Sequence, residues 1–329
     1  MKYISLKICL LIVALFGGMA VAADFDKGMN AYDSGDYKAA LVEWTPLAEQ
    51  GLAKAQYNLA RLYHFSYGVP QNYKMALKWY TLAAEQEYSD AQYNLATMYD
   101  NGEGAPQNYK TALKWYTLAA EQGDDYAQFN LANMHYYGDG VPENYKTAVK
   151  WYTLAAEQGY AKAQYSLGYM YAEGKGVLEN DRTAAKWYTL AAEQGYADAQ
   201  YELAHMFEKG KGVLENNKTA YRWAKAAAAQ EHADAQGYLG YLAMNDADYI
   251  RSYMWFSLAV YTGAHEKSKK DKDTIKSLMT RADIDKAQEM ASRCLESGYT
   301  DCGMIDKKTA TQQLDEDQQA LNSLLVDEQ

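Results

Sequence analysis

The 329-residue sequence has few of the residue patterns that build enzyme and metal sites. It contains three cysteines and five histidines, and it has no H-x-x-x-H or H-E-x-x-H pair. It lacks G-x-S-x-G, S-x-x-K beyond residue 22, and a third glycine at Rossmann spacing after its G-x-G pairs. These absences give no local support to a serine nucleophile, a metal site or a dinucleotide site. We therefore expect no catalytic activity, no metal and no cofactor.

Basic charge and long apolar runs are also scarce. The formal net charge is −11, and an acidic surface of this size argues against nucleic acid and anionic membranes as partners. No segment after residue 22 has 18 uninterrupted apolar residues. We therefore predict no transmembrane segment after removal of the N-terminal signal described next.

Residues 1–22 have the features of a secretory signal. Lys2 and Lys7 precede a short apolar core at 8–16, and a small-x-small site follows at Ala20-Val21-Ala22. This pattern predicts cleavage between Ala22 and Ala23. The signal is typical of bacteria, so we expect a periplasmic or secreted protein.

The most informative feature is a repeat of 36 residues. Tryptophans recur at this spacing, and so do methionines and paired glycines: Trp79, Trp115, Trp151, Trp187 and Trp223; Met98, Met134, Met170 and Met206; Gly102/Gly104, Gly138/Gly140, Gly174/Gly176 and Gly210/Gly212. Self-similarity at a fixed period in this range is typical of a solenoid.

Each repeat contains two helical patterns. In residues 109–122 the apolar side chains recur at i, i+3, i+4, i+7 and i+8, with Asn108 as a candidate N-cap and Gly123 as the residue after the helix. In residues 125–137 they recur at i, i+4 and i+7 before two glycines end the helix. Neither helix can bury its apolar stripe alone, so neighbouring pairs must stack.

The string A-x-A-Q-Y-N-L-A-x-M-Y-x-x-G-x-G-V-x-x-N-Y-K-x-A-x-K-W-Y-T-L-A-A-E-Q-G resembles the Sel1-like repeat, a relative of the tetratricopeptide repeat. The resemblance covers about three quarters of the chain. It implies an all-α, right-handed α/α solenoid of six to seven helix pairs without β-sheet. It also implies a role in protein interaction and no reaction.

On this basis we divide the chain after the signal into five segments. They are a divergent tetratricopeptide-like opening pair at 23–51, five Sel1-like repeats across 52–231, a degenerate closing repeat at 232–264, a C-terminal capping region at 265–302 and a poorly ordered tail at 303–329. The five repeats begin at residues 52, 88, 124, 160 and 196.

Two places depart from the repeat. Trp44 precedes Trp79 by 35 residues, which suggests that one residue is missing near Pro46 and predicts a bent or shortened helix there. The charged run from His265 to Asp273 predicts a loop. It is followed by a capping-box pattern at 280–283 that opens a helix over about 282–295.

Two cysteines remain after signal cleavage. Cys294 and Cys302 lie eight residues apart, and in an oxidising compartment this spacing favours a local disulfide. The alternative, a redox-active pair, lacks the C-x-x-C spacing.

The second helical pattern of each repeat also has a polar and aromatic face opposite Ala127, Leu131 and Met134. By resemblance to tetratricopeptide arrays, this face lines a concave groove. We call the residues at one position in successive repeats a column. One aromatic column and two variable columns contribute the candidate binding residues: Tyr93, Phe129, Asn133, Tyr136, Tyr165, Tyr169, Tyr201 and His205. An alternative interpretation is that the aromatic column only packs one repeat on the next.

We therefore expect a non-enzymatic scaffold or adaptor of the bacterial envelope that binds a protein or peptide in the groove. A secreted host-interaction factor is one alternative. Another is a β-lactamase-like or cell-wall enzyme, because a cysteine-rich branch of the family is associated with β-lactam binding. That branch carries a cysteine pair in each repeat, and the repeats of this chain contain none.

Overall fold

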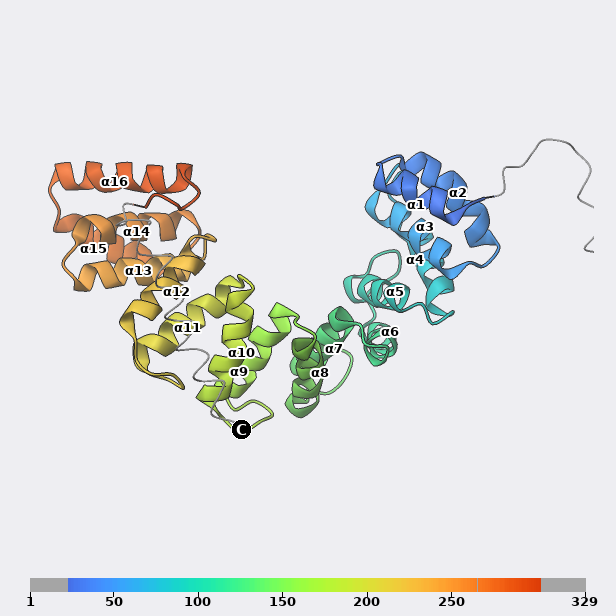
Figure 1. Ribbon diagram of the computed structural model, residues 1–329, viewed down its shortest axis with the longest axis horizontal. Coiled ribbons are helices and arrows are strands. Elements are labelled where there is room, and N and C mark those ends of the chain that lie inside the picture. The colour runs from blue at the N-terminus through green and yellow to red at the C-terminus, as the bar shows by residue number, and fades with distance from the viewer. Residues whose placement is uncertain (1–22, 265, 303–329) are drawn as a thin grey trace, which may run out of the picture. The chain divides into compact units, whose positions relative to one another are not determined.

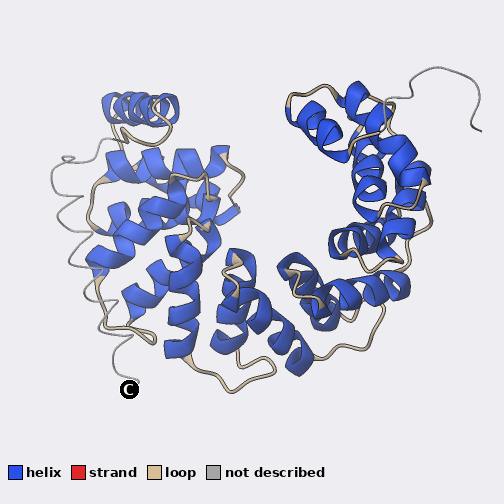
Figure 2. Ribbon diagram, turned by 45° about the vertical axis from the view of Figure 1, so that its right-hand side comes forward, coloured by secondary structure: helices blue, strands red, loops and turns tan. Residues whose placement is uncertain are grey.

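The structure is a computed structural model that describes residues 23–264 and 266–302. Throughout these residues the regular elements are helices, and none is a strand (Figure 2). The proposed signal at 1–22 and the tail at 303–329 lie outside the described residues. The chain divides into two compact units, the first ending at Gln122 and the second beginning at Gly123.

Sixteen helices make up the two units in the described ranges (Figure 1). The first unit contains α1 (Phe25–Asp33), α2 (Tyr37–Glu49), α3 (Ala53–Phe65), α4 (Tyr73–Ala84), α5 (Ser89–Asn101) and α6 (Tyr109–Glu121). The second unit contains α7 (Asp125–Tyr137), α8 (Tyr145–Glu157), α9 (Ala161–Ala172), α10 (Asp181–Glu193), α11 (Ala197–Lys209), α12 (Asn217–Ala228), α13 (Ala233–Asn245), α14 (Tyr249–Tyr261), α15 (Glu266–Ser277) and α16 (Arg281–Glu296).

Within each unit every odd-numbered helix from α1 to α13 packs against the even-numbered helix that follows it. The even-numbered helix then packs against the next odd-numbered helix of the same unit. The arrangement is an all-α solenoid of seven helix pairs, followed in the described part by α15 and α16. It confirms the fold class expected from the 36-residue period.

The helix ends follow the sequence signals. The side chain of Asn108 accepts a hydrogen bond from the backbone N–H of Thr111 at 3.0 Å. Asparagines also cap α4, α8, α10 and α12 in this way. Gly123 follows α6 with φ of +96°, a conformation that glycine adopts without steric cost.

The paired glycines place each loop against the preceding repeat. Gly176 has φ of +73°, and a Cβ atom there would lie 2.5 Å from the carbonyl oxygen of Tyr145. Gly104 makes the same close approach to Tyr73. A side chain at either glycine would push the loop away from the start of the preceding even-numbered helix. The residue between the two glycines is thereby held against that earlier repeat.

The core of the first unit surrounds Trp44, Tyr80 and Leu95, which are fully buried. The second unit has three core clusters. One surrounds Tyr152 and Leu167, one surrounds Tyr188 and Leu203, and the last joins α13 and α14 to the C-terminal helices.

A row of buried glutamines hydrogen-bonds one repeat to the next. The Nε2 atom of Gln164 donates to the carbonyl oxygen of Ala156 at 3.1 Å, and its Oε1 atom accepts from Gln194 at 2.7 Å. Gln56, Gln92 and Gln200 make the equivalent pair of bonds. These bonds satisfy buried amide groups that would otherwise cost free energy.

The expectation of a missing residue and a shortened helix at Pro46 is wrong. Helix α2 has 13 residues, as many as α6, so it is not shortened. Trp44 lies 36 residues before Tyr80, and both side chains are completely buried. Trp44 therefore belongs to the column of Tyr80 and not to that of Trp79, and no residue is missing.

The expectation of a loop at 265–273 is also wrong, because α15 begins at Glu266. Its only buried residue is Ile275, so the helix lacks the apolar stripe by which helices are recognised in sequence. The helix packs on α14 instead, where the ammonium of Lys272 lies 5.5 Å from the ring centroid of Tyr253. Residue 265 itself lies outside the described residues.

The C-terminal end of the array is held by α16 and a disulfide. Helix α16 begins after Thr280, whose hydroxyl accepts from the backbone N–H of Asp283 at 3.2 Å, as the capping-box pattern predicts. Cys294 and Cys302 form the expected bridge, with both residues buried in the last core cluster. Nearby, Gln236 ends the glutamine row by donating to the hydroxyl of Tyr299 at 3.3 Å.

Candidate functional site

The odd-numbered helices carry the candidate residues on one face, which we call the groove face. Phe129 and Tyr136 pack against one core cluster of the second unit, and Tyr165 and Tyr169 pack against the next. Phe129, Tyr165 and their equivalents in the aromatic column are half-buried. The ring centroid of Phe129 lies 5.8 Å from that of Tyr152 in α8 and 5.2 Å from that of Tyr160 at the start of the next repeat. The aromatic column thus packs between repeats and keeps part of each ring accessible.

A pocket of about 390 Å³ lies on the groove face of the second unit, between α7 and α9. Five of the eight predicted residues line it: Phe129, Asn133, Tyr136, Tyr165 and Tyr169. Residues that we did not single out in the sequence complete it, among them Tyr137, Lys162, Ser166 and Tyr196. The structure therefore brings the middle of the predicted site together.

Two tyrosines of the pocket, Tyr165 and Tyr152, are held in their neutral form. Burial raises the pKa of Tyr165 above its ordinary value, and the nearby Glu202 carboxylate raises it further. Burial likewise raises the pKa of Tyr152. These phenols therefore remain protonated at neutral pH and can donate hydrogen bonds.

Asn133 has a structural contact that its sequence position does not reveal. Its Oδ1 atom accepts a hydrogen bond of 2.6 Å from the hydroxyl of Tyr152, whose side chain is buried. In the first unit, Thr97 contacts the hydroxyl of Tyr116 at 3.1 Å in the equivalent position. In both units, a residue in the column of Asn133 therefore hydrogen-bonds the hydroxyl of a buried tyrosine.

This contact predicts the effect of Asn133→Ala on folding. The variant should lower the free energy of unfolding by about 1–3 kcal/mol, because the buried hydroxyl of Tyr152 loses its acceptor. Tyr152→Phe removes that hydroxyl, so adding Asn133→Ala to it should cost clearly less than Asn133→Ala costs in the wild type. Urea denaturation of the four proteins measures the coupling, and strictly additive losses would contradict the prediction.

Lys175 lies at the edge of the pocket because it stands between Gly174 and Gly176. Its Nζ atom donates to the hydroxyl oxygens of Tyr136 at 2.7 Å and Tyr169 at 3.1 Å. The ammonium also lies over both rings, 5.1 and 4.9 Å from their centroids. The hydrogen bond to Tyr136, followed by that to Tyr169, raises the pKa of Lys175, so the lysine is charged at neutral pH.

Tyr201 and His205 lie in a second pocket of about 440 Å³, also within the second unit. The imidazole Nδ1 of His205 is 3.2 Å from a carboxylate oxygen of Glu208, and its ring packs on Tyr201 with a centroid distance of 4.7 Å. Helix α15 closes one side of this pocket with Lys267, Ser268 and Asp271. Both acidic and basic side chains line this pocket, whereas no acidic side chain is among the described residues that line the first pocket.

Tyr93, the remaining predicted residue, belongs to the first unit. It is half-buried, and its ring centroid lies 6.0 Å from that of Tyr116. It therefore lies in a different unit from the two pockets.

Five consecutive segments of the chain match the Sel1 repeat: residues 53–88, 89–124, 125–160, 161–196 and 197–232. Together they make up more than half of the chain. The chain belongs to the Sel1 repeat family. Sel1 repeat proteins are generally protein-interaction scaffolds, and the fold is typically non-enzymatic.

Solved structures of Sel1 repeat proteins resemble the chain. One from Oxalobacter formigenes is 32% identical, with a TM-score of 0.64 over 67% of this chain and 91% of that one. A protective antigen of uropathogenic Escherichia coli is 23% identical, with a TM-score of 0.36 over 84% of this chain and 85% of that one. An immunity protein of Pseudomonas aeruginosa is 21% identical, with a TM-score of 0.38 over 71% and 83%.

Only the first of these three alignments is strong enough to support the fold. No curated protein matches the chain. In the described ranges, none of the helices is both long and apolar enough to cross a membrane.

The sequence signal for the missed residue Lys175 lies in the Sel1 repeat itself. The residue between the paired glycines changes along the array, from Glu103 through Asp139 to Lys175 and Lys211. We interpreted the glycines only as turns, whereas the side chain between them reaches the previous repeat. In the first unit Glu103 likewise contacts His64, with 2.8 Å between Oε2 and Nε2. No comparable signal points to Ser268 of α15.

Proposed function

We propose that this Sel1 repeat protein is a non-enzymatic scaffold that is exported to the bacterial envelope or beyond and binds a peptide or protein segment on its groove face. The pocket that gathers Phe129, Asn133, Tyr136, Tyr165 and Tyr169 carries the proposal. Half-buried tyrosines suit this role because they offer a large rigid surface and a polar group at little cost in conformational entropy.

The second pocket, with Tyr201 and His205, extends the proposed surface along the second unit, and Tyr93 offers a similar ring in the first. Export is supported by the buried Cys294–Cys302 bridge, because structural disulfides persist in oxidising compartments. The N-terminal signal pattern agrees with this proposal.

A paired substitution tests the binding surface. Tyr137 lines the pocket and is 68% exposed, and Tyr169 is half-buried. Tyr137→Ala with Tyr169→Ala should reduce the affinity for a captured envelope protein by about tenfold or more, since aromatic anchors often contribute over about 1 kcal/mol each. The measurement is quantitative affinity capture from envelope extract, followed by titration of the purified partner.

The matched control replaces two exposed tyrosines of α14, Tyr249 and Tyr261. This control variant should bind the partner as the wild type does, and both double variants should retain wild-type helicity by circular dichroism. Unchanged partner affinity in the Tyr137/Tyr169 variant would place the binding surface elsewhere.

A further inference from the structure

The charge of the pocket between α7 and α9 is opposite to that of the whole protein. The chain has a formal net charge of −11. Among the described residues that line the pocket there is no aspartate or glutamate, whereas Lys162 lines it and Lys175 donates to two of its tyrosines. The nearby carboxylates lie outside this lining: Glu202 and Asp198 act on Tyr165, Asp198 also hydrogen-bonds Tyr196, and Glu143 acts on Tyr145.

Three polar side chains of the pocket already accept hydrogen bonds, which leaves their hydrogens to donate. The hydroxyl oxygens of Tyr136 and Tyr169 both accept from Lys175, so their protons must point to other acceptors. Asn133 accepts from Tyr152 through its oxygen, which leaves its Nδ2 hydrogens to donate. Lys175 has a third N–H to donate. Asn133, Tyr136 and Tyr169 therefore offer hydrogen-bond donors close to the positive charge of Lys175.

We propose that this pocket binds the carboxylate of a glutamate or aspartate side chain in the partner segment. A carboxylate offers two oxygens with about four acceptor sites, which complement the donors of Asn133, Tyr136, Tyr169 and Lys175. This inference rests on the proposed function and specifies the chemistry of its partner.

The arrangement of the aromatic column favours a side chain over a chain terminus. Phe129 and Tyr165 both line the pocket, and Tyr201 continues the same column one repeat further. A bound segment that continues past the pocket can therefore contact further rings of this column. A segment that ended at the pocket would make fewer of these contacts.

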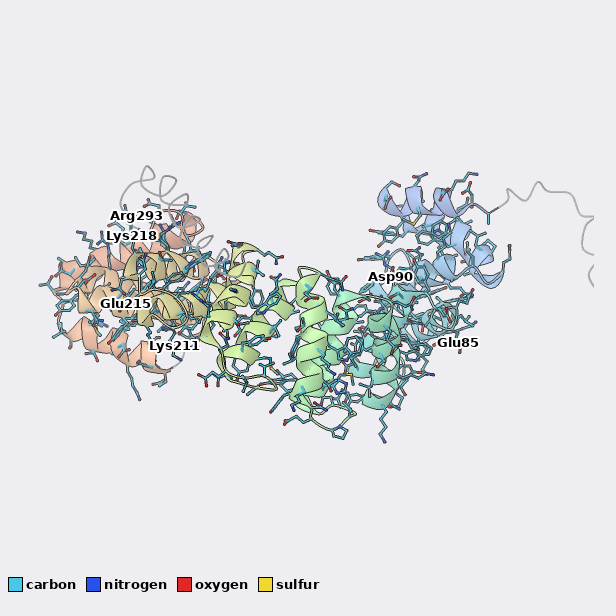
Figure 3. All side chains as sticks on the ribbon, turned by 60° about the horizontal axis from the view of Figure 1, so that its bottom comes forward. Glu85, Asp90, Lys211, Glu215, Lys218 and Arg293 are labelled. Atoms are coloured by element: carbon cyan, nitrogen blue, oxygen red, sulfur yellow. A yellow bond between two sulfur atoms is a disulfide. The ribbon has the colours of Figure 1, made fainter. Side chains whose placement is uncertain are left out.

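Lys211 provides a matched control for Lys175. It occupies the same position between paired glycines one repeat later, in the loop joining α11 to α12, where Figure 3 labels it together with Glu215. Lys211 is exposed, and the residue corresponding to Tyr136 in its repeat is Ala172. Replacing Lys211 therefore removes the same charge without removing a tyrosine-bound ammonium.

The experiment titrates capped pentapeptides, acetyl-Gly-Gly-X-Gly-Gly-amide with X as Glu, Gln or Lys, into protein carrying ¹³C-labelled tyrosine. A fourth probe, acetyl-Gly-Gly-Ala-Gly-Gly, carries a free C-terminal carboxylate. Tyr136→Phe and Tyr169→Phe assign the two ring resonances. The Glu peptide should shift both resonances to saturation, and the Gln peptide should bind at least about tenfold more weakly because it lacks the charge.

Lys175→Met should abolish the preference for Glu over Gln, whereas Lys211→Met should retain it. Lys175→Arg keeps the charge and should restore the preference, which separates loss of the ammonium from misfolding. Raising the salt concentration from 0.05 to 0.5 M, shortening the screening length, should weaken Glu binding in the wild type.

Several outcomes would overturn the carboxylate site. They are equal binding of the Glu and Gln peptides, a preference for the Lys peptide, saturation by the free C-terminus alone, or an unchanged Glu preference in Lys175→Met. A partner whose capture depends on Tyr137 and Tyr169 but not on Lys175 would refute this inference and leave the scaffold function intact. Capture that depends on none of Tyr137, Tyr169 and Lys175 would refute both the carboxylate site and the proposed binding surface.

Discussion

Replacing Trp44 with alanine should lower the free energy of unfolding of the opening helix pair by about 3–5 kcal/mol, the usual cost of truncating a buried tryptophan. The side chain is fully buried, and its indole N–H donates to the carbonyl oxygen of Phe25 at 3.3 Å. Its ring packs on Phe25 and Tyr32 of α1 and fills the space left by Gly28. The variant removes the main anchor between α1 and α2.

Hydrogen exchange followed by mass spectrometry should show lost protection in α1 and α2 of Trp44→Ala. The exposed Val42 on the same helix provides the control, and Val42→Ala should change stability by less than about 0.5 kcal/mol. A repeat array can unfold in parts, so local protection is a better measure than one global transition. Unchanged protection of α1 in Trp44→Ala would contradict the packing described here.

Reduction of the Cys294–Cys302 bridge should destabilise the C-terminal end by about 2–3 kcal/mol, as the chain-entropy relation gives for a loop of this length. Both residues are buried in the cluster that joins α13 and α14 to α16. Tyr299 lies within the bridged loop and contacts Gln236. Loosening the loop should therefore also expose the end of the glutamine row.

Thermal unfolding with and without dithiothreitol measures this effect. The wild type should lose stability on reduction, whereas Cys294→Ala with Cys302→Ala should not respond to the reagent. Hydrogen exchange in α16 should increase, and exchange in α8 and α9 should remain unchanged. Two reactive thiols in the unreduced protein would contradict the bridge.

The repeated helices could be predicted from the sequence because their signal occurs five times. Asn108 and Gly123 marked the ends of one helix, and the same marks recur every 36 residues. The register of Trp44 could not be predicted in this way. We aligned like residues, whereas burial makes Trp44 equivalent to Tyr80. Helix α15 was missed because it has no apolar stripe, and Ile275 is its one buried residue.

The candidate site could be predicted only in part for a related reason. Comparing equivalent positions of the repeats identified residues of the groove face, including Tyr136 and Tyr169. It could not show that Asn133 satisfies the buried hydroxyl of Tyr152, because that contact joins two helices of the same repeat. It also could not place Lys175, since the approach of its loop to Tyr145 depends on how repeats stack.

The glutamine row makes the length of this protein adjustable. The bonds between glutamines join residues 30 positions apart, such as Gln194 to Gln164 and Gln230 to Gln200, and the bonds to backbone carbonyls join residues eight apart. Excision of residues 161–196 would bring Gln200 to the place of Gln164, opposite the carbonyl oxygen of Ala156. The shortened chain would regain every bond at the new junction. Gene duplication or loss of one 36-residue unit can therefore add or remove a repeat without leaving an unpaired glutamine at the junction.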